Sequence, residues 1–141
     1  MTAATNRRAV LIRGALHVAL ALTWLGAFVA THIPRGDVPP VGVSDKTLHA
    51  LGYFVLATLL LLTLAARGAA RVRRAALTAA VLAAYAAVDE ITQALVNRQP
   101  AVDDWLADVL GAAAAIALWE VVLAIYARRR PTAAASHTRR R

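Results

Sequence analysis

The chain has 141 residues, of which 60% are hydrophobic and 17% are charged, a composition too apolar for an ordinary soluble domain and typical of a protein in lipid. Cysteine is absent, which excludes disulfides and thiolate metal sites. The net charge of +8 comes mainly from arginines at the chain ends and in one short loop, a distribution that suits a membrane surface and leads us to expect no nucleic-acid partner.

The first apolar stretch covers residues 14–33 and follows Arg7, Arg8 and Arg13. It is longer than the apolar core of a cleaved signal peptide, which has about 7 to 15 residues. We therefore expect a retained membrane anchor. A segment rich in proline and glycine, residues 34–42, then ends the stretch and predicts a loop.

Three more apolar stretches follow at residues 47–66, 75–96 and 105–127, and a short basic loop, residues 67–74, separates the first two of them. Each stretch has about 20 residues, which at about 1.5 Å per residue matches a hydrocarbon core of about 30 Å. The sequence therefore predicts an all-α membrane protein, a four-helix transmembrane bundle.

Lysine and arginine in the short flanks of the spans predict the orientation. The basic flanks are the segment before the first span, the loop 67–74 and the segment after residue 127, so both termini are expected to be cytoplasmic. We expect a basic cytoplasmic N-terminus (residues 1–13), a transmembrane domain (residues 14–127) and a basic disordered cytoplasmic tail (residues 128–141). The basic flanks are expected to contact anionic lipids of the cytoplasmic leaflet.

Polar residues inside the spans share one depth, toward the expected outer face. At about 100° per residue, those of each span occupy one third of the helix surface. Acidic residues facing lipid would each cost about 2.5 to 3.5 kcal/mol, so the polar surfaces are expected to face one another in one outward-opening pocket. The candidate pocket residues are Asp45, Lys46, His49, Tyr53, Asp89, Glu90, Gln93, Arg98, Asp104, Asp108 and Gly111.

Polar contacts between membrane helices can also serve adhesion alone, contributing only about 0.6 to 2 kcal/mol per hydrogen bond. Lys46 or Arg98, each paired with a carboxylate, would satisfy that interpretation. The excess of charge favours a functional site instead, because the cluster holds six acids against these two bases. The acids are Asp45, Asp89, Glu90, Asp103, Asp104 and Asp108.

The same residues carry a family resemblance. The motifs are S-D-K-x-x-H-x-x-x-Y from Ser44, D-E-x-x-Q from Asp89, then Arg98, and D-W-x-A-D-x-x-G from Asp104. In order and spacing they resemble the VanZ-like family of bacterial membrane proteins, over about half of the chain. Asp108 stands where that family often has asparagine. The resemblance implies a multi-pass protein of the bacterial cytoplasmic (inner) membrane, and the family's founding member is linked to resistance to a glycopeptide antibiotic.

Three functions remain open. The cluster can bind an envelope lipid or a glycopeptide-type antibiotic without turnover. Alternatively, a metal-assisted membrane enzyme can act on a phosphate-containing lipid head group, with His49 and Asp45 as acid and base and Asp89, Glu90 and Asp108 on a divalent cation. The third is proton or cation movement. The sequence requires no cofactor, and the cluster's negative charge disfavours a bare phosphate ligand unless a metal or protons intervene.

Overall fold

The four apolar stretches form long helices in the computed structural model, which describes residues 3–34, 42–96 and 98–129. In chain order they are α1 (Ala3–Thr31), α2 (Asp45–Ala66), α3 (Arg71–Gln93) with a short 3-10 turn η2 (Ala94–Val96), and α4 (Val102–Arg129). All four helices are long and apolar enough to cross a membrane. The predicted all-α transmembrane bundle is thus confirmed. Of the predicted disordered tail (residues 128–141), Arg128 and Arg129 belong to α4, and the rest lies outside the described residues.

All four helices begin before the apolar stretches that the sequence predicts, so α3 includes residues 71–74 of the predicted basic loop, and α2 and α4 have acidic residues in their first turns. The Ser44 side chain caps α2 by accepting a hydrogen bond from the Thr47 backbone N–H at 3.2 Å. Asp45 therefore lies in the first turn of α2, as Asp103 and Asp104 do in the first turn of α4. Negative side chains are favourable there because the helix dipole is positive at the N-terminus.

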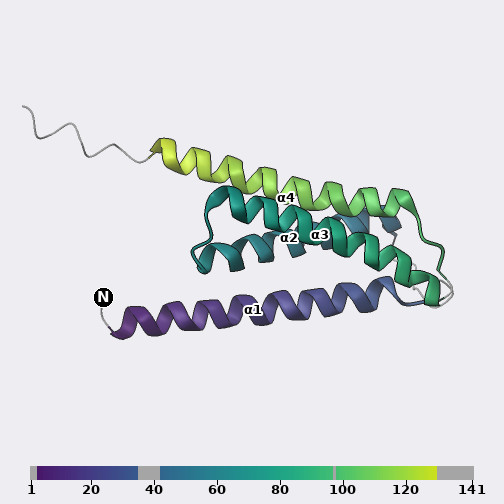
Figure 1. Ribbon diagram of the computed structural model, residues 1–141, viewed down its shortest axis with the longest axis horizontal. Coiled ribbons are helices and arrows are strands. Elements are labelled where there is room, and N and C mark those ends of the chain that lie inside the picture. Colours follow the sequence, from purple (N-terminus) through teal and green to yellow (C-terminus); the bar gives the residue numbers. More distant parts are fainter. Residues whose placement is uncertain (1–2, 35–41, 97, 130–141) are drawn as a thin grey trace, which may run out of the picture.

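The helices run side by side, with the N-terminus of α1, the C-terminus of α4 and the α2–α3 turn at the same end of the bundle (Figure 1). Both α1 and α4 project beyond that turn. The turn contains Gly68 at φ 80°, a conformation that glycine adopts without strain. α2 and α4 begin at the opposite end of the bundle, where the acidic residues of the candidate pocket therefore lie.

The tightest packing is between α2 and α4, which share the most extensive contact of the bundle. At its centre Gly111 lies so close to Ala50 that an added Cβ would come within 2.1 Å of the Ala50 carbonyl oxygen. Small residues permit such close approach between membrane helices. The core that forms around this contact consists of Tyr53, Leu56, Ala57, Leu82, Ala86, Ala112 and Ala115.

α1 lies at the periphery of the bundle and contacts mainly α2, with a smaller contact to α3. Trp24 packs edge-on against Tyr85 with ring centroids 4.8 Å apart. Apolar side chains such as Leu22 and Leu25 are exposed on its other side, as expected for a surface that faces lipid. This loose attachment leaves a seam between α1 and α2.

Candidate functional site

The two bases of the predicted site each pair with a carboxylate at the edge of the cluster. Lys46 pairs with Asp103 and lies 3.8 Å from Asp104. The Arg98 Nη2 group donates to Asp45 at 3.1 Å. Both interactions join the start of one helix to a neighbouring segment. Both predicted bases are therefore engaged in ion pairs at the edge, and neither pairs with the most deeply buried acids.

A buried histidine–carboxylate pair joins α2 to α4. His49 and Asp108 are almost inaccessible, with side chains 3% and 0% exposed. The Nδ1–H group of His49 donates to Oδ1 of Asp108 at 3.0 Å. This bond leaves the Nε2 lone pair of neutral His49 available to a ligand, a proton or a metal ion. The second oxygen of Asp108 is buried and has no hydrogen-bond partner in the described part of the chain.

Glu90 approaches this pair from α3. Ligand atoms of His49, Glu90 and Asp108 all lie within 4.8 Å of one another. One Glu90 oxygen accepts a hydrogen bond from the Ala101 backbone N–H at 2.8 Å, and the other accepts from Gln93 at 3.2 Å. The connection between α3 and α4 thus fixes the position of this carboxylate.

The side chain of Asp89 points in a different direction from that of Glu90, its neighbour in sequence. Its carboxylate accepts hydrogen bonds from Thr31 at 3.1 Å and from Tyr85 at 3.4 Å, and the His32 ring lies 3.8 Å away. His32 also bonds to Thr92 at 3.0 Å. Asp89 therefore faces α1, whereas Glu90 faces α4. The polar surface of α3 serves two neighbours rather than one.

A pocket of about 310 Å³ lies in the seam between α1 and α2. Its lining includes the apolar residues Ala27, Ala30 and Leu48. The same lining includes the polar residues Thr31, Asp45, His49, Tyr53 and Arg98. The buried Tyr53 hydroxyl has no hydrogen-bond partner among the described residues. The pocket thus combines an apolar lining with an unsatisfied buried hydroxyl, as an amphiphilic ligand would require.

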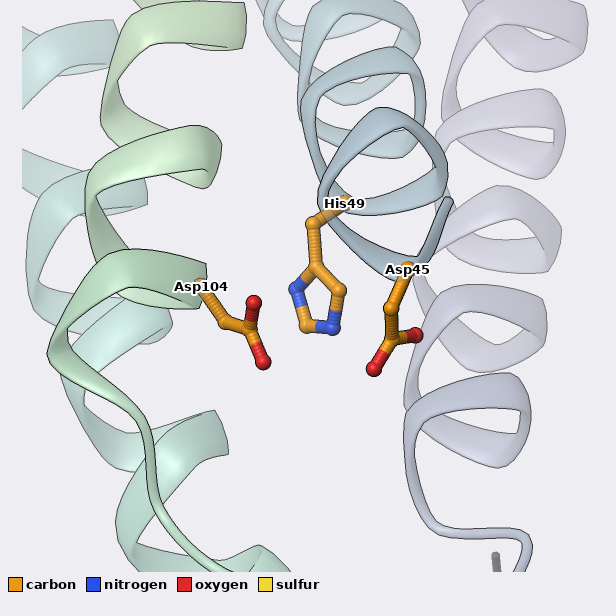
Figure 2. A group of neighbouring side chains, drawn as sticks. All are labelled: Asp45, His49 and Asp104. Carbon is orange, nitrogen blue, oxygen red and sulfur yellow. The ribbon is translucent and has the colours of Figure 1, made fainter. Parts of the chain in front are cut away.

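Two overlapping groups of side chains have the spacing of metal ligands, and His49 belongs to both. One is His49 with Glu90 and Asp108. The other is Asp45, His49 and Asp104, in which the imidazole stands between the two carboxylates (Figure 2). A histidine nitrogen with two carboxylate oxygens suits Zn²⁺, Mn²⁺ or Fe²⁺. The predicted set placed Asp89 beside Glu90 and Asp108 on the cation, but Asp89 is in neither group.

Positive and negative charges are distributed unevenly across the site. With Lys46 and Arg98 engaged at the edge, the buried acids Asp89, Glu90 and Asp108 have only histidines as possible cationic neighbours within ion-pair distance, among the described residues. Carboxylates crowded in a low-dielectric interior repel one another. Protons, a metal ion or a cationic ligand group would relieve this repulsion.

Gly111 has no polar side chain, and its role is structural, because it forms the close α2–α4 contact beside the site. Thr31, His32 and Thr92 were absent from the predicted pocket, although they join Asp89 at the end of α1. The polar pair Thr31 and His32 at the end of an apolar span was the available signal for them.

The VanZ/LLP1 family model matches residues 10–123, a range that contains all of the predicted site residues. No curated protein and no solved structure shows a match.

Proposed function

This chain belongs to the VanZ/LLP1 family, and from its pocket we propose that it is a bacterial cell-envelope protein that binds the polar head of an envelope amphiphile. Its ligand is an envelope lipid or a glycopeptide-type antibiotic, and the function is resistance or envelope homeostasis. The protein resides in the inner membrane with both termini cytoplasmic, so the pocket opens outward.

One observation supports this proposal: the lining of the pocket between α1 and α2 combines apolar residues with His49, Tyr53 and the Asp45–Arg98 ion pair. A lipid or lipopeptide could lay its hydrocarbon part along Ala27 and Leu48 and place its polar part against His49 and Tyr53. The peripheral position of α1 supports entry of such a ligand from the side, directly from the bilayer. Glu90 and Asp108, whose ligand atoms lie within 4.8 Å of that of His49, favour a head group that carries hydrogen-bond donors or positive charge.

The second candidate is a metal-assisted enzyme acting on a phosphate-containing lipid head group, and the buried group of His49, Glu90 and Asp108 favours it. A bound divalent cation would polarise a phosphoryl oxygen and offset the negative charge of the site. Asp108 orients the His49 ring, so Nε2 is available as a ligand or as a base. Glu90 is held by two hydrogen bonds in the same position.

Purification in mild detergent with Mn²⁺ or Zn²⁺ present tests both candidates on one sample. The binding function predicts that native mass spectrometry detects a copurified envelope amphiphile, unchanged in mass, in the wild type. His49→Ala should lose most of it. The enzyme predicts a bound metal ion by elemental analysis, lost in Glu90→Gln, and a change of mass when the extracted lipid is returned to the protein.

Trp105→Phe is a matched control because Trp105 lies outside the α1–α2 pocket, with its indole N–H bonded to the Ala83 carbonyl at 3.3 Å. It should retain both ligand and metal. If the His49→Ala and wild-type proteins copurify with the same lipids in the same amounts, the binding function is wrong. If the wild type takes up no metal, the enzyme is wrong.

A further inference from the structure

A second buried polar group lies at the end of the bundle where α3 begins, far along α3 from Asp89 and Glu90. It consists of Arg74 and Thr78 on α3 and Trp119 on α4. Arg74 is 8% exposed and Thr78 is fully buried. The guanidinium carbon of Arg74 lies 5.6 Å from the centroid of the Trp119 ring, a cation–π distance.

Each side chain of this group has one buried polar atom that is unsatisfied. Arg74 Nε, Thr78 Oγ1 and Trp119 Nε1 are all buried, and none has a hydrogen-bond partner within the described ranges. Each of these atoms carries a hydrogen to donate. Unsatisfied buried donors are rare in folded proteins, and three of them on these segments of α3 and α4 point to an acceptor supplied from outside the chain.

The charge of Arg74 is also unmatched. The carboxylate near this end of α3 is Glu120, which pairs with the Nε group of Arg71 through Oε2, while its buried Oε1 has no hydrogen-bond partner among the described residues. Arg74 has no ion-pair partner among the residues that the structure describes. A cation removed from water without a counter-ion is unfavourable, so the complement of this group should be negatively charged. Arg73, the adjacent arginine, is exposed and is not held in this way.

We propose that Arg74, Thr78 and Trp119 form a binding site for the phosphodiester of an anionic phospholipid. Phosphate oxygens accept the hydrogen bonds that a guanidinium, a hydroxyl and an indole offer, and arginine binds phosphate with matched geometry. The neighbouring side chains Val72 and Leu118 are exposed and apolar, which suits contact with acyl chains. The exposed Arg73 adds attraction for an anionic membrane surface.

The site predicts a preference for anionic over zwitterionic lipid that depends on one arginine rather than on total charge. Charge-assisted hydrogen bonds to a buried guanidinium correspond to a preference of about tenfold or more. Native mass spectrometry of the full chain, with phosphatidylglycerol and phosphatidylcholine in competition, measures this preference. Thermal unfolding in detergent with each lipid measures its effect on stability.

The decisive comparison is between Arg74→Gln and Arg73→Gln, because the two variants lose the same charge at adjacent positions. We expect Arg74→Gln to lose the preference for phosphatidylglycerol and Arg73→Gln to retain most of it. Without anionic lipid, Arg74→Gln should melt at the wild-type temperature or above, since it removes a buried cation that has no counter-ion. Equal losses in the two variants would show diffuse charge attraction and would overturn the site.

Two further measurements separate the remaining alternatives. Trp119→Phe keeps the aromatic face under Arg74 but removes the N–H donor, so it should fold and should lower the preference by a few-fold. An unchanged preference for phosphatidylglycerol in Trp119→Phe would overturn the proposal. If Arg74→Gln does not fold, the measurement on Trp119→Phe tests the proposal in its place. Inorganic phosphate, tested in phosphatidylcholine alone, should not reproduce the stabilisation; if it does, the ligand is a soluble anion and the lipid assignment is wrong.

Discussion

The polar side chains of the candidate site divide into two groups with different partners. At the edge, Lys46 pairs with Asp103 and Arg98 pairs with Asp45, interactions that adhesion between helices would predict. Inside, His49 pairs with Asp108, and Glu90 is held by hydrogen bonds alone. The buried acids are therefore not the ion-pair partners of Lys46 and Arg98. This separation makes adhesion and function distinguishable by mutation.

Neutralising the buried acids should preserve the fold and remove the function. Glu90→Gln and Asp89→Asn each keep one oxygen atom that accepts hydrogen bonds, and neither strands Lys46 or Arg98, which pair elsewhere. Relief of repulsion should leave stability unchanged or slightly higher. The proposed function, resistance or envelope homeostasis, should be lost in both variants. Protein level, thermal unfolding in detergent and the phenotype are measured together.

Asp103→Asn is the control, because Asp103 is 59% exposed and its ion pair at the edge should contribute only about 0 to 1 kcal/mol. It should change neither stability nor function. If the buried acids serve as partners of a cation, neutralisation should instead cost about 3 to 5 kcal/mol, and accumulation would fall with activity. Normal function in both neutral variants would refute the site.

At the level of elements, the site depends on how closely α2 approaches α4. His49 and Asp108 belong to these two helices, and Gly111 lies one turn after Asp108 at their closest contact. A hydrogen bond of 3.0 Å between His49 and Asp108 tolerates little separation of the helices. Gly111 therefore determines the geometry of the site without contacting a ligand.

Gly111→Ala should lower stability by about 1 to 3 kcal/mol or more, because overpacking a tight contact forces the backbone to shift. The added Cβ would meet the Ala50 carbonyl oxygen at 2.1 Å, and a backbone group cannot move aside as a flexible side chain can. Thermal unfolding in detergent measures the loss. Gly26→Ala is the matched control: its Cβ meets nothing within 4 Å, so the variant should be neutral or slightly stabilised. Equal melting temperatures for the two variants would contradict this account.

At the scale of the whole molecule, the bundle has two chemically different ends. The end where α2 and α4 begin carries the acidic site, and the end where α3 begins carries Arg71, Arg73 and Arg74. Both described chain ends lie with the arginines (Figure 1). The distribution of positive charge favours a cytoplasmic location for that end. The acidic pocket would then open to the outside of the cell membrane.

Cysteine labelling tests this orientation without background, because the chain contains no cysteine. Val43→Cys, near the start of α2, should react with a membrane-impermeant reagent in intact cells, and Ala70→Cys, before α3, should react only after permeabilisation. Both positions are exposed, so access to the aqueous phase alone separates them. Labelling of Ala70→Cys but not Val43→Cys in intact cells would invert the topology.

The sequence by itself determined the class of the protein, its spans and the shared depth of its polar residues. The length of an apolar stretch and the helical period of its residues are local properties of the sequence. In lipid they therefore predict the same membrane-spanning helices, whatever those helices contact. The motifs from Ser44 to Gly111 likewise indicated the family that the match over residues 10–123 establishes.

The tertiary structure alone decided which polar side chains meet. Asp89 and Glu90 are adjacent in sequence, yet one bonds to Thr31 of α1 and the other to the Ala101 backbone before α4. Arg74 differs from Arg73 only because its helix face packs on Trp119. Hydropathy does not determine these partners, because they depend on the rotation and separation of packed helices, which close contacts such as that between Gly111 and Ala50 set.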